Sequence, residues 1–274
     1  MSSTRNPAPT AAAPTEKVLV GREGAVLTIT LNRPEKANAI DADMIEGLSH
    51  AYARLSDDPT LRVAVVRSNG PHFTGGLDLA SLAPRLATGG EGLIPATGRD
   101  PWGMYGESAT KPVVVAVHGR CFTAGLELVL NADLCVASAD TLFGQQEVTR
   151  GIVALGGATV RLPHRAGWGN AMRYLLTGDQ FDAQEAWRMG VVQEVVRPGE
   201  QFDRATALAH RIAQQAPLAV QATLADARAA LRGPIAASAA SLRGEVGPRL
   251  FATADAAEGI SALIERRTPV YTGA

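Results

Sequence analysis

The chain has 274 residues, of which 46% are hydrophobic and 19% are charged, and its formal net charge is −1. This composition is typical of a globular protein with enough apolar material for a core. A nearly neutral chain disfavours a nucleic acid or an anionic membrane as a partner held by bulk electrostatics. The apolar runs also fall far short of the ~20 residues that a membrane span needs. We therefore expect no nucleic-acid and no membrane partner.

The N-terminal residues 1–15 are rich in Ser, Thr, Ala and Pro. They lack the apolar core of a secretory signal, so we predict a disordered leader in a cytoplasmic protein. Cys121 and Cys135 lie among apolar or small residues and are predicted to be reduced core thiols. The five histidines show no ligand spacing, so the sequence predicts no metal site.

The first part of the chain alternates strand and helix signals. Asp41 is a predicted helix N-cap, and a second helix is expected to begin near Asp78, after Gly75-Gly76. Residues 83–110 have no clear period and carry six glycines, which indicates a functional or mobile loop. The other expected elements are a β-hairpin over 17–31, a helix over 42–56 and a buried strand over 62–68.

The central stretch, 113–157, carries a buried strand, a glycine turn and a short apolar helix that contains Glu127. From 17 to 132 a strand–strand–helix theme recurs, which indicates stacked ββα units. The helical signal dominates after residue 200. We therefore predict an α/β core over 16–200 and a helical region over 201–274. Further elements expected are a strand over 134–137, helices over 159–165, 171–176 and 182–189, a strand over 191–196, and four helices from 202 onward.

Two glycine-rich turns could each direct a backbone N–H into a shared cleft. Each turn ends a strand and begins a helix, where N–H groups lack intrahelical acceptors. Two such donors on one oxygen form an oxyanion hole, and the candidates are the N–H groups of Leu77 and Ala124. The alternative is that the glycines only permit tight turns.

The central stretch 113–157 contains two glutamates, Glu127 and Glu147. A pair of carboxyl groups can handle a water molecule, with one accepting a proton while the other donates one. Glu127 could instead be a helix N-terminal residue stabilised by the helix dipole. Glu147 could be a solvated loop charge beside Arg150. The apolar neighbours of Glu127 favour a buried position.

Six motifs in order resemble the crotonase (enoyl-CoA hydratase/isomerase) superfamily over about residues 18–271. They are LNRPEKANAI (31–40), HFTGGLDL (72–79), VHGRCFTAGLELVLNADLCVAS (117–138), FGQQEVTRGIV (143–153), TGDQFDAQEAWRMGVVQEVV (177–196) and EGISALIERRTPVY (258–271). The resemblance implies a spiral of ββα units followed by a C-terminal helical trimerisation region. It also implies a homotrimer, or a hexamer formed by two trimers.

The resemblance further implies the activity of an enoyl-CoA hydratase, which adds water across the C2=C3 bond of a 2-enoyl-CoA. Leu77 and Ala124 match the two oxyanion N–H positions, and Glu127 and Glu147 match the two catalytic glutamates. No cofactor is implied, because coenzyme A is part of the substrate. The positions that match substrate contacts are Lys36, Ala37, Ala39, Thr74, Gly75, Gly76, Asp78, Leu155 and Arg266.

This sequence departs from the family pattern near both glutamates. Thr123-Ala124-Gly125 replaces a run of glycines, Gln146 replaces a proline, and Leu155 replaces a glycine where acyl chain and water must fit. A second hypothesis is therefore another crotonase-fold reaction, such as double-bond isomerisation, thioester hydrolysis or decarboxylation. A third is a non-catalytic acyl-CoA-binding paralogue.

Overall fold

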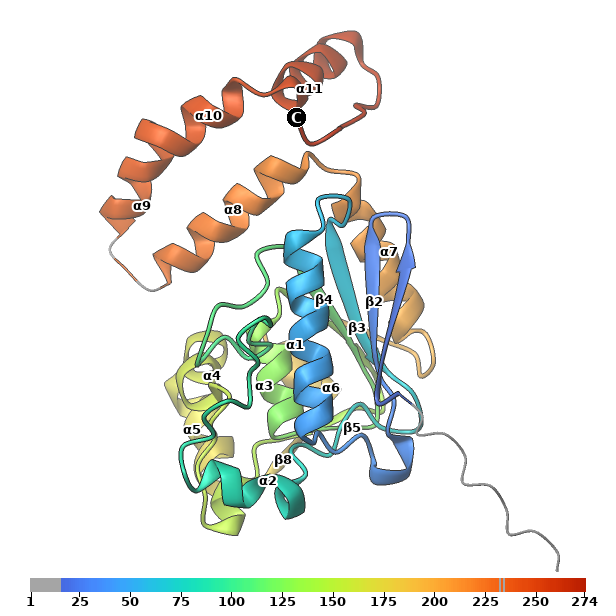
Figure 1. Cartoon of the computed structure of the whole chain (residues 1–274), viewed down its shortest axis with the longest axis vertical. Coiled ribbons are helices and arrows are strands. Elements are labelled where there is room, and N and C mark those ends of the chain that lie inside the picture. Colours follow the sequence, from blue (N-terminus) through green and yellow to red (C-terminus); the bar gives the residue numbers. More distant parts are fainter. Residues whose placement is uncertain (1–15, 232, 234) are drawn as a thin grey trace, which may run out of the picture.

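The structure is a computed structural model that describes residues 16–231, 233 and 235–274 (Figure 1). The predicted leader, 1–15, lies outside the described residues. Within the described ranges, no helix combines the length and apolar character needed to cross a membrane.

A six-stranded sheet forms the centre of the described chain, in the order β1-β2-β3-β4-β6-β9. β1 and β2 form the predicted antiparallel hairpin, and every later neighbour is parallel. The turn is tighter than predicted, because β1 continues through Gly21 and pairs up to Glu23. The strands are β1 (Val18–Glu23), β2 (Val26–Leu31), β3 (Val63–Ser68), β4 (Val113–Val117), β6 (Leu134–Ser138) and β9 (Glu194–Val196).

The continuous apolar runs of the central strands are explained by helices on both faces of the sheet. In β4, Val113, Val115 and Val117 join the larger core, which contains most of the buried apolar residues of α1 (Ala42–Asp57) and α3 (Ala124–Asn131). The intervening Val114 and Ala116 join a smaller core with Ala205 and Ala209 of α7 (Gln201–Ala213). In Figure 1, α1 covers one face of the sheet and α7 the other.

A second, three-stranded sheet has the order β5-β7-β8. The sequence did not predict it, since each strand has three residues and no alternation can be read over that length. β5 (Arg120–Phe122) pairs in parallel with β7 (Leu142–Gly144), which pairs antiparallel with β8 (Gln180–Asp182). This sheet joins the two turns that precede Glu127 and Glu147.

The remaining core helices confirm several predicted boundaries. Asp41 caps α1, accepting a hydrogen bond from Met44 N at 3.1 Å, and Asp182 caps α6, accepting one from Glu185 N at 2.8 Å. The helical segment after Glu147 breaks at Gly167, which ends one helix and precedes the next. The helices are α2 (Leu79–Leu86), α4 (Ala158–Ala166), α5 (Trp168–Thr177) and α6 (Ala183–Arg188), with 3₁₀ turns η1 (Pro34–Lys36) and η2 (Glu147–Arg150).

The C-terminal helices leave the core after α7, whose own apolar face packs on the sheet. α8 (Pro217–Ala230) follows α7, and α9 (Ile235–Ser241) lies beside α8 (Figure 1). We call α8 to α11 the arm; its last helices are α10 (Gly247–Phe251) and α11 (Ala254–Glu265). The domain boundary at residue 200 stays a prediction.

The predicted helix over 236–252 is interrupted by a π-helical turn, η3 (Leu242–Val246). Gly247 donates its N–H to Leu242 O, five residues back, and a Cβ at Gly247 would lie 2.6 Å from that oxygen. Pro248 follows and has no N–H to donate. The glycine and the proline together explain why the regular α-helical bonding stops here.

Candidate active site

The first turn orients the backbone at Leu77. Ile40 N donates to Gly76 O and Asp78 N donates to Ile40 O, both at 2.8 Å. These two bonds use the residues on either side of Leu77, so its own N–H points away from Ile40. In the described chain this N–H has no hydrogen-bond acceptor, and Leu77 lines a cavity.

The second turn precedes α3. Thr123 N donates to Gly144 O at 2.8 Å, and Thr123 has a φ of +48°, which L-residues rarely adopt. α3 begins at Ala124, whose N–H is therefore one of the first helical N–H groups without an intrahelical acceptor. A β-bridge between Thr74 and Cys121 joins the two turns. They touch so closely that a Cβ at Gly76 would lie 1.8 Å from Thr123 Oγ1.

Glu127 lies in the first turns of α3 and is 2% exposed. Its Oε1 accepts a hydrogen bond from Ala158 N at 3.1 Å. Burial raises the pKa of Glu127 to about 7, and the charge of Glu147 acts in the same direction. A buried carboxyl group with a pKa near neutrality can accept or donate a proton under ordinary conditions.

Glu147 begins η2 and is 9% exposed, so it is not the solvated loop charge that the sequence left open. Burial raises its pKa above the usual range. The buried Gln145 donates from Nε2 to Glu147 Oε1 at 2.7 Å. Glu147 Oε2 is buried and has no partner among the described groups. Each glutamate is therefore held through Oε1 to a fixed donor, and Glu147 keeps an oxygen free.

Two cavities meet at these residues. The glutamate cavity, of about 280 Å³, is lined by Glu127 and Glu147 together with Leu77. The loop cavity, of about 560 Å³, lies beside it and also contacts Leu77 and Glu127, as well as Ala124. Leu155 lines both cavities and is therefore placed where the sequence predicted a narrowing.

The predicted contact residues of the first turn divide into lining and supporting groups. Gly75 lines the glutamate cavity. Thr74 is fully buried, and its Oγ1 donates to Asn38 O at 2.6 Å and accepts from Gly76 N at 3.0 Å. Asp78 forms an ion pair with Arg33 at 2.8 Å. Thr74 and Asp78 thus hold the shape of the turn.

The loop at 36–39 is held in a fixed conformation beside this turn. Gly75 N donates to Ala37 O at 2.8 Å, and Ala37 has a φ of +50°. Asn38 is buried and donates from Nδ2 to Asn69 O and His72 O at 2.8 and 2.9 Å. Lys36 remains exposed.

Arg266 is the one predicted contact residue on the arm. It follows α11 as its C-cap and is exposed. In Figure 1, α11 lies at the opposite end of the molecule from α2, so a single chain does not bring Arg266 to the cavities.

The irregular segment 87–112 supplies one wall of the loop cavity. Trp102 lines that cavity and donates from Nε1 to Ala124 O at 3.0 Å, while Tyr105 lines it from the same turn. Asp100 is 1% exposed, and its carboxylate accepts hydrogen bonds from the N–H groups of Trp102, Met104 and Tyr105 at 2.7–2.8 Å. The wall is therefore ordered by one buried carboxylate.

Sequence reasoning missed two residues of this site, Gln145 and Asp100. Gln145 lies between β7 and η2, so no strand or helix period relates it to Glu147, and the sequence carries no signal for this contact. Asp100 stands in a segment without periodicity, where no pattern marks a contact.

The fold and the order of motifs can be compared with known proteins. The family model for enoyl-CoA hydratase/isomerase matches residues 21–274. The chain belongs to this family. Carnitinyl-CoA dehydratase from Salmonella paratyphi B is 36% identical over 266 residues, covering 94% of this chain and 99% of that protein.

Solved structures of the family agree with the fold. A probable enoyl-CoA hydratase/isomerase from Mycobacterium abscessus is 47% identical, with a TM-score of 0.91 and coverage of 94% of this chain and 99% of that chain. Enoyl-CoA hydratase from Mycobacterium tuberculosis is 35% identical, with a TM-score of 0.84 and coverage of 95% and 100%. The predicted crotonase fold is thereby confirmed, and the chain has the fold of an acyl-CoA enzyme family.

Proposed function

We propose that this family member is an enoyl-CoA hydratase that adds water across the C2=C3 bond of a 2-enoyl-CoA. The observation that carries the proposal is the pair of buried glutamates from separate elements that line one cavity with Leu77. The pKa of each glutamate is raised by burial. Such pairs suit reactions in which one proton is accepted and another is donated.

The thioester carbonyl binds between the N–H groups of Leu77 and Ala124. When the oxygen of water adds to C3, negative charge develops on this carbonyl as an enolate. Two N–H donors already fixed by the turns stabilise that charge without reorganising, and losing one such donor typically costs about 3–4 kcal/mol.

The two carboxyl groups divide the proton transfers. Water binds between Glu127 and the unpartnered Oε2 of Glu147. The group that is ionised takes a proton from water as its oxygen adds to C3, and the group that is protonated gives its proton to C2, so the two exchange protonation states in one turnover. The hydrogen bonds that Ala158 and Gln145 donate to the Oε1 atoms of Glu127 and Glu147 hold both carboxyl groups in position for this water.

Coenzyme A lies along the loop at 36–39 and the turn at 74–78. The carbonyl groups of Ala37 and Ala39 each accept one hydrogen bond within the chain and keep a second lone pair for the pantetheine, and the exposed Lys36 offers a positive charge to the phosphates. Arg266 serves this role from another copy of the chain in a trimer or hexamer, since its own cavities lie at the far end of the molecule.

A second candidate is dehydration of a 3-hydroxyacyl-CoA whose acyl group carries a cation. Dehydration is the reverse of the same reaction and needs the same glutamates, and one relative is named carnitinyl-CoA dehydratase. The wall of the loop cavity supports it, because Trp102, Tyr105 and Glu91 combine aromatic rings with a carboxylate. Such a combination attracts a quaternary ammonium group.

The experiment is turnover of crotonyl-CoA, followed by the loss of its conjugated enoyl absorbance, with carnitinyl-CoA dehydration measured in parallel. Glu127→Gln and Glu147→Gln should each lower turnover by about 10²-fold or more, because the variants keep the shape but not the proton transfer. Glu46→Gln, on the exposed face of α1, is the matched control.

A wild-type protein that binds both thioesters and changes neither would overturn the hydratase proposal for short chains, and one that also leaves longer 2-enoyl-CoA thioesters unchanged would overturn it altogether and leave the other crotonase-fold reactions. Those are double-bond isomerisation, thioester hydrolysis and decarboxylation, for which Leu155 alters the space beside the glutamates. Full activity in either glutamine variant would show that its glutamate is structural.

A further inference from the structure

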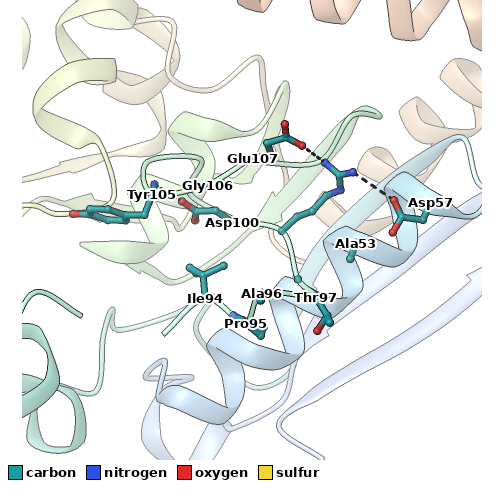
Figure 2. A pocket seen from close by; sticks show the side chains of 12 residues that line it. Ala53, Asp57, Ile94, Pro95, Ala96, Thr97, Asp100, Tyr105, Gly106 and Glu107 are labelled. Atoms are coloured by element: carbon teal, nitrogen blue, oxygen red, sulfur yellow. Dashed lines mark hydrogen bonds and ion pairs between the residues drawn. The ribbon is translucent and has the colours of Figure 1, made fainter. Parts of the chain in front are cut away.

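A third cavity, of about 520 Å³, lies between the C-terminal half of α1 and the segment 94–107 (Figure 2). We call it the distal cavity. The segment supplies most of its lining, including Ile94, Ala96 and Tyr105, and α1 supplies Ala53 and Asp57. None of the residues proposed above for catalysis or coenzyme A binding lines it.

The distal cavity adjoins the loop cavity. Ile94 and Tyr105 line both, so these two side chains form the boundary between them. The loop cavity in turn contacts Leu77, Ala124 and Glu127, where the thioester and C3 are placed. An acyl chain that begins at the glutamates and fills the loop cavity is therefore directed toward this boundary.

The two cavities differ in chemistry. Ile45, Leu86, Leu93 and Trp102 make the loop cavity largely apolar. The distal cavity is polar, and Arg99 contributes the guanidinium group to its lining, together with the carboxylates of Asp57 and Glu107, which Figure 2 labels. Arg99 forms ion pairs with these carboxylates at 3.4 and 3.1 Å.

Charge at the distal cavity selects the group that it can accept. The two ion pairs satisfy Arg99, and both of its partners are largely exposed, with side-chain exposures of 69% for Asp57 and 89% for Glu107. The buried Asp100 adds a third carboxylate to the lining, although backbone N–H groups bind it. Carboxylates thus outnumber cations, so an incoming carboxylate is repelled and a hydrogen-bond donor is favoured.

We propose that the distal cavity binds the far end of the acyl group, and that the substrates are 2-enoyl-CoA thioesters of extended chain ending in a hydroxyl or amino group. The methylene chain lies in the loop cavity and passes between Ile94 and Tyr105. The terminal group then donates a hydrogen bond to the carboxylate of Asp57 or to that of Glu107. This inference rests on the proposed function for the placement of the thioester.

The first experiment compares crotonyl-CoA with dec-2-enoyl-CoA and the ω-hydroxy and ω-carboxy derivatives of the latter. Wild-type kcat/KM should be at least about tenfold higher for the ω-hydroxy than for the ω-carboxy thioester. The double variant Asp57→Asn/Glu107→Gln should reduce this ratio by about fivefold or more. Glu200→Gln, a surface carboxylate paired with Arg197 away from the cavity, should leave the ratio unchanged.

The second experiment fills the cavity. Ala96 is exposed and lines only the distal cavity among the three described, so Ala96→Trp occupies that space. The variant should lower kcat/KM for the ω-hydroxy thioester by at least about tenfold relative to crotonyl-CoA. Calorimetric binding of the saturated ω-hydroxydecanoyl-CoA should weaken in parallel, which reports on the subsite without any reaction.

The outcomes separate the two proposals. If crotonyl-CoA is turned over but the decenoyl series shows no ω-hydroxy preference, or Ala96→Trp leaves the series unchanged, the distal subsite is wrong and the hydratase stands. If no thioester is hydrated but calorimetry shows ω-hydroxy binding that Ala96→Trp weakens, the subsite stands and the hydratase fails.

Discussion

Glu127 is a carboxyl group that the fold holds out of water, and this has a consequence for stability as well as for catalysis. Its pKa is about 7, against 4.5 for the unperturbed group, because burial disfavours the charged form. Between these values the folded state binds more protons than the unfolded state. Stability therefore falls as pH rises through this window, by about 3 kcal/mol in total.

Glu127→Gln should remove this pH dependence. A neutral amide has no charge to desolvate, so the variant should gain stability relative to wild type as pH rises from about 5 to 8. Thermal unfolding at a series of pH values measures the difference, and any fixed cost of the amide appears as a constant offset. Glu46→Gln should show no such trend. A difference that stays flat for Glu127→Gln would contradict the burial described for this carboxyl group.

Gln145 is a positioning residue for Glu147. Its amide holds Oε1 at 2.7 Å, and this bond lowers the pKa of Glu147 against the opposing effect of burial. Gln146 is its neighbour in sequence, but its side chain forms no hydrogen bond to either glutamate among the described groups.

Gln145→Leu should lower kcat by about tenfold or more, because Glu147 loses the donor that fixes its orientation. The same change should raise the pKa of Glu147 further and move the corresponding limb of the pH–rate profile to higher pH. Gln146→Leu is the matched control and should change neither. A loss of kcat without a displaced pH profile would indicate general disruption of the site instead of loss of this bond.

At this scale the sequence predicted the charged residues better than the residues that orient them. Glu127 and Glu147 stand out because a carboxylate among apolar neighbours is conspicuous, and the structure does bring them to one cavity. Gln145 could not be singled out in the same way, since an amide beside a loop has many uses. Its partner depends on β7 and η2 meeting at one point.

The two turns at the site pack so closely that no side chain fits at Gly76. Gly76 has a φ of +101°, and a Cβ there would meet Thr123 Oγ1 at 1.8 Å. Thr123 itself adopts a φ of +48° before α3. A non-glycine residue in such a conformation costs about 1–3 kcal/mol, which indicates that the surrounding turns impose it.

Gly76→Ala should destabilise the protein by about 2–4 kcal/mol, through the clash and the strained φ. Thr123→Gly should change stability by only about 1 kcal/mol, in the stabilising direction. The double variant should be more stable than the sum of the single effects predicts, because the clashing atom is gone. Denaturant unfolding of the four proteins measures this coupling. Gly169→Ala, with open space around its Cβ, should not be destabilising. Strict additivity would contradict the contact between the turns.

The sequence predicted long elements with periodic apolar residues and missed short ones. α1 and β4 follow directly from their patterns, because each buries a regular face. The second sheet consists of three-residue strands whose pairing is set by tertiary contacts. The π-helical turn in the arm depends on Gly247 and Pro248 together, and an otherwise helical pattern of side chains conceals it.

As a whole, the molecule has a core with a buried interior and an arm with exposed apolar side chains. Leu231, Phe251 and Leu263 are 74%, 79% and 79% exposed in the single chain. Contact with other copies of the chain would cover these side chains. The proposed trimer or hexamer provides that contact through further copies of the chain.

Light scattering coupled to size exclusion should therefore give the mass of a trimer or a hexamer. Phe251→Asp combined with Leu263→Asp should shift the protein toward monomer, because two charges would be buried against apolar surface. Glu245→Gln changes the charge of the same arm without adding a buried carboxylate, and it should keep the wild-type mass. A wild-type monomer at micromolar concentration would contradict the assembly.

Arg228 links the arm to the wall of the loop cavity. From α8 it donates to Ala109 O at 2.6 Å and to Asp133 Oδ1 at 2.9 Å. Ala109 belongs to the segment 87–112 that walls the loop cavity, so the arm holds one end of the acyl-binding wall. Any neighbour that fixes the arm also fixes that wall. Dilution below the assembly concentration should therefore lower specific activity toward long acyl chains before it affects crotonyl-CoA, making protein concentration a determinant of substrate range.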